Sequence, residues 1–431
     1  ARRSELRYQL EEQLMATDRA QPRRSKKGGE PPRWRRRLER ALIGTAIATP
    51  ISVLLLWLAV HRYPSLGPVI ADGLRSVLGT EAVSRLEDFV YGLEDRYNRW
   101  WREDEAPKAY WEVPSSSVSS APAPLGSRSA DLDAGPPQPA FRPADVGPMF
   151  KALAAAGDGV WVPVADPARP EDPALMYKTL IHPDSKRPWA ELFIVALDLP
   201  HLRLHLIAGT QEPRSATQEG RDYQRSGLVP TEHQGELLAA FNGGFKAEHG
   251  RWGMRIEGVT LIPGRAHGCT ITMAGELGLR IAPWQEVEQG ADTLAWWRQT
   301  PPCMILEGKR HGGLWDPDAK GWGAAVEGDT VIRRSALGLD QAAEVLFVSM
   351  TNHTSAQALA DGMRHAGSHT VAQLDVNWSF PRFVVFPRSA SGGRETQSLF
   401  EGFEVHPGDY LSEPAQRDFF YLVRAEPEPP R

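Results

Sequence analysis

The stretch VLFVSMTNHTSAQALADGMRHAGSHTVAQLDVNWSF, residues 345–380, has two apolar runs on either side of an amphipathic segment. The runs at 345–350 and 371–375 are short, contain Val and Leu, and end at polar residues, as strands do. A strand, a helix and a strand within one sheet predict a parallel pair joined by a right-handed crossover.

The segment between these runs has the features of a helix. Thr354 or Ser355 can accept hydrogen bonds from its first amides, and Gly367 suits the left-handed turn that ends many helices. Its apolar residues fall on one face: Ala356, Leu359, Ala360 and Met363. Because both strands then point the same way, residues 351–353 and 375–377 emerge at one edge, where α/β sheets bind ligands.

Strands dominate the chain from residue 148 to residue 424. In the run 202–207, for example, Leu alternates with Arg and His, as in a half-buried strand. The further strand candidates are 192–199, 202–207, 236–241, 254–262, 270–273, 303–306, 331–337 and 382–386. We therefore predict one domain over 148–424 with an α/β fold: a mixed, strand-rich sheet and a β-α-β crossover near the C-terminus.

A second informative stretch, AAFNGGFK at residues 239–246, ends a predicted strand at an Asn-Gly-Gly turn. Glycine reaches backbone angles closed to other residues, so the chain can reverse sharply at Gly243 and Gly244. Such a turn leaves the Asn242 amide and backbone N–H groups open to a polar or anionic ligand. Most Asn-Gly turns only reverse the chain, so this site depends on what converges there.

The N-terminal sixty residues divide into a basic arm and an apolar span. Residues 1–40 hold thirteen Lys and Arg against six Asp and Glu, a net charge of +7, and the remaining residues carry −12. Residues 41–60 contain no charged side chain and can cross about 30 Å of hydrocarbon as a helix. By the positive-inside rule, we predict a single-pass protein with a cytoplasmic arm and an extracytoplasmic domain. The low cysteine count suits a bacterial envelope protein, so we expect the inner membrane and a periplasmic domain.

Two other interpretations of this terminus are open. A cleaved signal peptide would here have an unusually long cationic region. The basic arm can also bind nucleic acid, but its place beside the span favours orientation and attraction to anionic lipid. We therefore predict contact with the membrane through residues 41–60 and no nucleic-acid partner.

Residues 61–106 are predicted to form an amphipathic helical region next to the membrane. Apolar side chains recur there at three- and four-residue steps: Val83, Leu86, Val90, Leu93, Tyr97 and Trp100. So few heptads more often lie on the parent domain or on a membrane surface than pair as a coiled coil. The segment 107–147 is a linker rich in Pro, Ser and Ala, and residues 425–431 form an acidic, Pro-rich tail.

Cysteine and histidine usage limits the possible metal chemistry. Only Cys269 and Cys303 occur, which excludes a disulfide-stapled mini-domain and a four-cysteine zinc site. The two can pair outside the cytoplasm or remain buried thiols, and both possibilities are open. His249, His267 and His353 lack metal-ligand spacing, and no Gly-rich nucleotide loop occurs, so we predict neither metal nor cofactor.

Three blocks in order, FNGGFK at 241–246, RRSALGLD at 333–340 and the stretch at 345–380, resemble the phosphodiester glycosidase family. The resemblance covers about residues 148–386. The loop Leu374-Asp375-Val376-Asn377 is similar to a bacterial branch with Leu-Asp-Ile-Asn, whereas better-known members have Leu-Asp-Gly-Gly-Gly-Ser. Those members also have Asp-Gly-Arg where this chain has Thr351-Asn352-His353.

The resemblance implies cleavage between an anomeric carbon and a phosphate oxygen. Because phosphate leaves readily as an anion, this cleavage needs less help from a general acid than the cleavage of an ordinary glycoside, for which enzymes use two carboxylates. Arg334 is the candidate for the departing phosphate because its planar fork matches phosphate oxygens, and Asp375 is the candidate nucleophile or base. His353 is the candidate proton donor or phosphate contact. Without the resemblance, an exposed strand arginine is the favoured interpretation of Arg334, whereas for Asp375 a turn cap and a catalytic role are both open.

The other candidate residues bind substrate: Asn242, Gly243, Gly244, Ser335, Asn377 and Trp378. Trp378 can stack on a sugar face, although a tryptophan after a strand more often serves packing. We expect a membrane-anchored hydrolase that removes sugar from a sugar-phosphodiester in envelope or exopolysaccharide glycan, with a carbohydrate or sugar-phosphate polymer as partner. The alternatives are a non-catalytic glycan-binding module on the same fold and a structural envelope protein.

Overall fold

The computed structural model describes residues 70, 73–74, 77–113, 141–274, 278–315, 322, 330–389 and 392–425. All of them fall within the unit Pro68–Arg431. The predicted arm 1–40, the span 41–60, the centre of the linker 107–147 and nearly all of the tail 425–431 lie outside these residues. None of the helices in the described part of the chain has the length and hydropathy that a bilayer crossing requires.

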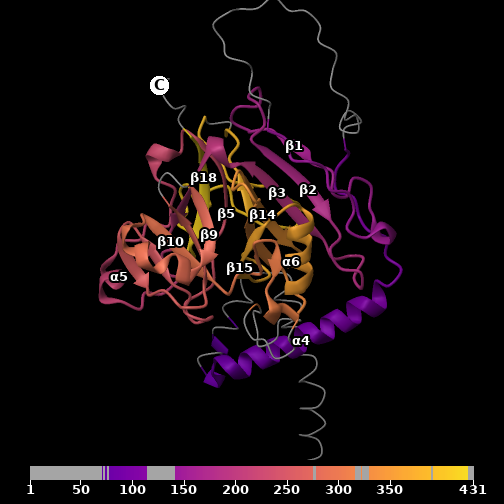
Figure 1. Ribbon diagram of the computed structural model, residues 1–431, viewed down its shortest axis with the longest axis horizontal. Coiled ribbons are helices and arrows are strands. Elements are labelled where there is room, and N and C mark those ends of the chain that lie inside the picture. The colour runs from indigo at the N-terminus through magenta and orange to yellow at the C-terminus, as the bar shows by residue number, and fades with distance from the viewer. Residues whose placement is uncertain are drawn as a thin grey trace, which may run out of the picture. The chain divides into compact units, whose positions relative to one another are not determined.

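The largest sheet has eight strands, each antiparallel to its neighbours, in the order β1-β2-β3-β14-β13-β15-β11-β12 (Figure 1). Its strands are β1 (Val162–Val164), β2 (Met176–Ile181), β3 (Leu192–Asp198), β11 (Ile305–Leu306), β12 (Lys309–Arg310), β13 (Arg334–Leu339), β14 (Val345–Thr351) and β15 (Thr370–Val376).

Two five-stranded sheets complete the architecture, with orders β7-β6-β10-β8-β9 and β17-β16-β5-β18-β4. The first contains β6 (Met254–Ile256), β7 (Val259–Ile262), β8 (Cys269–Met273), β9 (Leu279–Pro283) and β10 (Trp296–Thr300). The second contains β4 (Leu202–Ile207), β5 (Leu237–Asn242), β16 (Phe383–Val385), β17 (Gln397–Ser398) and β18 (Phe419–Arg424). The described helices are α4 (Thr80–Trp101), α5 (Gln218–Asp222) and α6 (Ala356–His365), besides short 3₁₀ turns.

The eight-stranded sheet is buried on both faces. On one face, Leu359 and Met363 of α6 belong to the same apolar cluster as Ile194 of β3. On the other, Val195 of β3 belongs to a larger cluster that includes residues of both five-stranded sheets. Burial on both faces explains why β3, β14 and β15 are nearly continuous apolar runs.

The predicted helix is confirmed, and the strand pairing around it needs a correction. Ser355 caps α6 by accepting a hydrogen bond from the Ala358 amide at 3.2 Å, and Gly367 has a φ of 110°. However, β14 and β15 are not neighbours, because each pairs antiparallel with β13, which lies between them. They still run in the same direction, so their carboxyl ends emerge at the same edge.

The prediction of a single strand over residues 254–262 needs a correction, and several strands were not predicted. Residues 254–262 form two strands, β6 and β7, because the chain turns at Glu257 and Gly258, whose φ angles are 49° and 80°. The strands that the apolar pattern did not predict are β1, β2, β9, β10, β12, β17 and β18. Strand β18 matters most here, because it lies between β5 and β4 and begins directly after Asp418.

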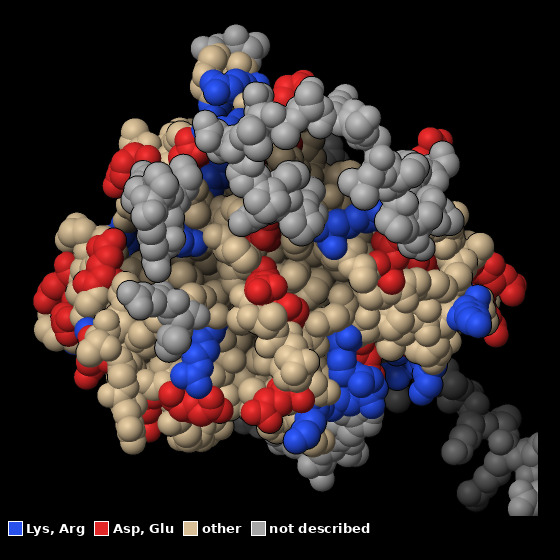
Figure 2. Space-filling view, turned by 45° about the horizontal axis from the view of Figure 1, so that its top comes forward, with Lys and Arg blue, Asp and Glu red and all other residues tan. Residues whose placement is uncertain are grey.

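Of the two possibilities for the cysteines, a disulfide or two buried thiols, the structure has a disulfide bond between Cys269 and Cys303. It joins the first residue of β8 to the segment that precedes β11. On the face drawn in Figure 2, Lys and Arg side chains lie among Asp and Glu side chains, around a broad area of other residues.

Candidate active site

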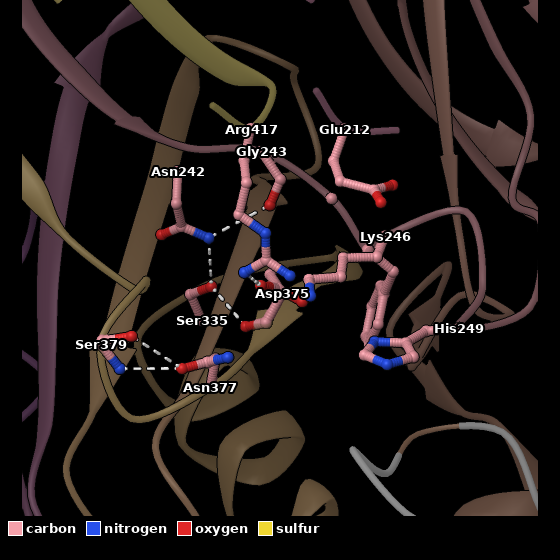
Figure 3. A network of polar contacts seen from close by, with 12 residues as sticks. Glu212, Asn242, Gly243, Lys246, His249, Ser335, Asp375, Asn377, Ser379 and Arg417 are labelled. Atoms are coloured by element: carbon pink, nitrogen blue, oxygen red, sulfur yellow. Dashed lines mark hydrogen bonds and ion pairs between the residues drawn. The ribbon is translucent and has the colours of Figure 1, made fainter. Parts of the chain in front are cut away.

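The Asn-Gly-Gly turn at the end of β5 is a buried junction. The Asn242 side chain donates to the Ser335 hydroxyl at 2.8 Å and to the Gly243 carbonyl at 3.1 Å, and accepts from the Arg382 amide at 3.1 Å. Ser335 in turn donates to the Asp375 carbonyl at 2.9 Å (Figure 3). The structure therefore brings Asn242, Ser335 and Asp375 together, but the Asn242 amide is fully used within the protein.

The two glycines of the turn also have protein partners. The Gly243 amide donates to the Asp418 carbonyl and the Gly244 amide to the Asp418 carboxylate, each at 2.9 Å. A Cβ at Gly243 would lie 2.3 Å from Asp418 Oδ2, and one at Gly244 would lie 2.8 Å from the Arg298 guanidinium. The prediction of open amides is thus wrong, because these glycines permit close approach to a buried ion pair.

Asp375 is the penultimate residue of β15 and belongs to a second buried ion pair. Its Oδ2 pairs with Nη1 of Arg417, whose side chain is 11% exposed. Its Oδ1 has no hydrogen-bond donor, and neither Nε nor Nη2 of Arg417 has an acceptor, within the described residues. The Arg417 guanidinium also lies over the Phe380 ring at 4.3 Å. Three buried polar atoms are therefore left without partners around one pair, which is uncommon in a folded protein.

The electrostatics of Asp375 follow from this environment. Burial raises the pKa of its carboxyl above the usual 3.8, and the charge of Arg417 is the largest influence that lowers it again. The charge of Lys246 also lowers this pKa, whereas the carboxylate of Asp418 raises it. Figure 3 shows Lys246 and Arg417 on the same side of Asp375. A buried carboxylate with two cations beside it is suited to reaction with, or binding of, an anionic ligand.

Arg334 lies elsewhere, contrary to the sequence-based expectation. It is fully buried, and its guanidinium donates to the carbonyls of Trp322, Thr330 and Thr354. Gln373 donates to the same Trp322 carbonyl, and Trp322 belongs to the apolar cluster that α6 forms. The fork of Arg334 is thus occupied by backbone carbonyls instead of pointing to Asp375.

An irregularity between β13 and β15 underlies this separation. Arg334 pairs with Val376 and Ala336 with Gln373, so β15 has one residue more than β13 between these pairs. Such bulges re-aim side chains and occur next to active sites. The sequence suggests that side chains point alternately to the two faces of the sheet along each strand, and this alternation is therefore interrupted at Asp375.

His353 and Trp378 form a separate cluster. Their rings meet edge to face at 4.7 Å, and Arg333 donates to the Trp378 carbonyl at 2.8 Å. Burial lowers the pKa of His353 to about 4, and the charges of Arg102 and Arg333 lower it further. The ring is therefore neutral near pH 7, which does not suit the role of proton donor, and the alternative role of phosphate contact stays a prediction.

Asn377 lies between the two clusters in the chain. Its Oδ1 accepts hydrogen bonds from the Ser379 amide at 2.9 Å and the Ser379 hydroxyl at 3.0 Å. In Figure 3 its amide nitrogen points toward the side on which Asp375 lies. Its predicted contact with substrate stays a prediction.

Sequence reasoning missed Arg417 and gave Lys246 no role. Arg417 and Asp418 form a charged pair directly before the apolar run of β18, and that position at a strand end was the available signal. In the described ranges, no group of three or more His, Cys, Asp and Glu side chains is arranged to hold a metal ion.

Comparisons with known proteins give only distant similarities. No family model and no curated protein matches the chain. The chain is similar to the catalytic domain of zebrafish N-acetylglucosamine-1-phosphodiester alpha-N-acetylglucosaminidase, auto-inhibited by its pro-peptide, with 11% identity and a TM-score of 0.37 over 62% of this chain and 88% of that one. A putative exported protein from Burkholderia pseudomallei has 12% identity and a TM-score of 0.34 over 54% of this chain and 74% of that one. Both similarities are weak.

Proposed function

We propose that this chain hydrolyses a sugar joined through phosphate, with Asp375 as nucleophile or base and Arg417 as the phosphate contact. The observation that carries the proposal is the incompletely bonded pair: Asp375 Oδ1 and two nitrogens of Arg417 are buried without partners within the described residues. A sugar phosphate offers hydroxyl donors and phosphate acceptors that match these atoms. The resemblance of the three sequence blocks supports the same substrate class.

In the proposed reaction, the bond between the anomeric carbon and the phosphate oxygen breaks, and its electron pair leaves with the phosphate. As a base, Asp375 takes a proton from the water whose oxygen bonds to the carbon; as a nucleophile, it bonds to the carbon first and water releases the sugar afterwards. Arg417 donates to the departing phosphate through Nε and Nη2, the role first expected of Arg334. Lys246 adds positive charge beside them.

The proposed setting is the outer side of a bacterial inner membrane. The charge-free span 41–60 and the basic arm 1–40 support a single-pass anchor with the arm in the cytoplasm. Envelope or exopolysaccharide glycans containing sugar phosphates are the substrates that this setting would supply. The disulfide between Cys269 and Cys303 is in keeping with an oxidising compartment.

The test uses the full chain in detergent with a panel of sugar-1-phosphodiesters and the matching glycosides without phosphate. We expect sugar release from a phosphodiester and none from the matched glycoside. Asp375→Asn and Arg417→Met should each lower kcat/KM by about 100-fold or more. Asp292→Asn, at a side chain that is 97% exposed, is the control and should leave turnover unchanged. Full turnover by Asp375→Asn would exclude the proposed role.

A non-catalytic glycan-binding module is the second candidate, and one observation favours it. The Asp375 side chain is completely buried, so an anomeric carbon can approach it only after neighbouring groups move. If Arg417 stays in place, its free donors can still bind a sugar phosphate without turnover. Calorimetry would then report binding that Arg417→Met abolishes, with no product after prolonged incubation.

A further inference from the structure

Helix α4 contacts the domain mainly through polar side chains, and of its apolar residues Val83 is buried and Tyr91 packs on a cluster that contains Phe245 and Trp252. Asp95 forms two hydrogen bonds with Arg187, at 2.6 and 2.8 Å, and Asp88 accepts from the Thr330 hydroxyl at 2.7 Å. At the end of the helix, the Arg102 guanidinium lies over the Trp189 ring at 5.5 Å. An amphipathic helix of a soluble domain ordinarily buries its apolar face instead.

Beyond Val83, the apolar face of α4 is exposed. Seven of its side chains are between 45% and 71% exposed: Leu86, Phe89, Val90, Leu93, Tyr97, Trp100 and Trp101. At about 100° per residue they form a single stripe about 120° wide. Isolated exposed apolar residues are ordinary, but a continuous stripe of this kind marks an interaction surface.

Basic groups lie along one side of this stripe, and the acidic residues Glu87 and Glu94 lie along the other. Arg85, Arg96 and Arg99 are exposed on one side of it. An open hollow of about 540 Å³ adjoins the helix and is lined in part by Arg96, Arg99, Lys186, Trp100, Trp189 and Glu103. Positive charge next to tryptophan rings is the combination that favours an anionic lipid headgroup above an apolar layer.

We propose that the exposed face of α4 lies in the interface of a lipid bilayer. Only seventeen residues separate Val60, the end of the predicted span, from Leu78, so at full extension this segment reaches at most about 60 Å. The aromatic residues Tyr97, Trp100 and Trp101 gather at one end of the helix, in mutual ring contacts of 6.1–6.3 Å. The helix would hold the domain flat against the membrane that anchors the chain.

A second copy of this chain is the competing occupant of the same face. A coiled-coil seam uses two positions per heptad and is correspondingly narrow. The stripe on α4 is wider, because it includes the adjacent pairs Phe89–Val90 and Trp100–Trp101. Width and aromatic content therefore favour a lipid surface over a helix partner.

The experiment exploits the cysteine content of the full chain. Both native cysteines are in the disulfide, so a cysteine introduced at Leu93 is a unique thiol for an environment-sensitive fluorophore. The label is compared with one at Glu395→Cys, an exposed site on the domain. The full chain is mixed with vesicles of phosphatidylcholine containing phosphatidylglycerol, and quenching is measured with brominated lipid and with aqueous iodide.

We expect brominated lipid to quench the Leu93 label at least about 3-fold more than the Glu395 label, and iodide to quench it less. Adding Phe89→Ser and Trp100→Ser should remove this difference while the chain stays with the vesicles through residues 41–60. Equal quenching at both positions would overturn the proposal, as would failure of the chain to float with vesicles. A disulfide formed between Leu93→Cys residues of two copies would overturn it in favour of self-association.

Discussion

Arg417 and Asp418 are neighbours in the chain, yet they belong to two buried ion pairs of opposite character. Asp418 pairs with Arg298 at 2.8 Å, and the Arg298 guanidinium also donates to the carbonyls of Phe245 at 2.6 Å and Trp252 at 3.0 Å. Its partner carboxylate accepts the Gly244 amide as well. In the other pair, Asp375 and Arg417 together leave three buried polar atoms without partners within the described residues.

The difference separates a structural role from a ligand-binding role. A buried ion pair whose hydrogen bonds are all made holds its surroundings in one arrangement, and here it fixes the Asn-Gly-Gly turn against β18. A pair with unused donors and acceptors carries an uncompensated desolvation cost that a bound ligand can relieve. We therefore expect substitutions in the first pair to act on stability and substitutions in the second to act on ligand chemistry.

The largest expected effect is from Asp418→Ala. The substitution leaves the Arg298 guanidinium buried without its carboxylate and removes the acceptor of the Gly244 amide. Breaking a buried pair in this way should lower the free energy of unfolding by about 3–5 kcal/mol, measured by urea denaturation. Asp375→Asn should cost about 1 kcal/mol or less, because it removes a charge that is already poorly accommodated. Equal losses in the two variants would erase the proposed distinction.

The second prediction concerns the pKa of Asp375 in Arg417→Met. Burial already raises this pKa above 3.8, and loss of the Arg417 cation should raise it further. The carboxyl titration can be followed by NMR with carbon-labelled aspartate. An unchanged pKa would mean that Arg417 does not pair with Asp375 in solution. Lys246→Met should shift the pKa in the same direction by a smaller amount.

The same variant has a predictable stability profile. A carboxyl whose folded pKa lies above its unfolded value holds its proton more tightly in the folded state, so stability falls as pH rises through the folded pKa. Arg417→Met increases this shift and should therefore be less stable than the parent chain at pH 7. Below pH 3.8 the carboxyl is protonated in both states, so this part of the loss should vanish.

Local signals in the sequence predicted the parts of the fold that depend on neighbouring residues. Ser355 and Gly367 set the limits of α6, and the apolar runs located β14 and β15 together with Asp375 at a strand end. The amphipathic pattern of α4 was also predicted, but not that its polar face contacts the domain. The contact of the polar face with the domain depends on Arg187, which is far from α4 in the sequence. The periodicity of the helix therefore could not predict it.

The site was only partly predictable for the same reason. The register shift between β13 and β15 separates Arg334 from Asp375, although both belong to blocks that suggest a common site. The order of the strands in space determines which carbonyls accept hydrogen bonds from the Arg334 guanidinium. It also places Arg417 beside Asp375. Asn242, the last residue of β5, and Ser335, the second residue of β13, do lie beside Asp375, although the two strands belong to different sheets.

A third prediction tests why the turn requires glycine. In Gly243→Ala, the new methyl would lie 2.3 Å from Asp418 Oδ2, so Asp418 must move away from Arg298 or the turn must shift. We expect a loss of about 1–3 kcal/mol in the free energy of unfolding, as for other overpacked sites. Gly235→Ala is the matched control, because its new methyl would have no atom within 4 Å, and it should change stability little. Similar values for both variants would show that the turn adapts without disturbing the ion pair.

The last prediction concerns Ser335→Ala, which removes the link between the two regions. The Ser335 hydroxyl donates to the Asp375 carbonyl and accepts from the Asn242 amide, so its loss leaves two buried groups without this partner. We expect about 1–2 kcal/mol of destabilisation by urea denaturation. Ser349→Ala is the control: it is equally buried in the neighbouring strand, but its one hydrogen bond, to the Ala336 carbonyl, is longer at 3.4 Å. If Ser335→Ala costs no more than this control, the hydroxyl does not position Asp375, and the bulge alone determines where that carboxylate lies.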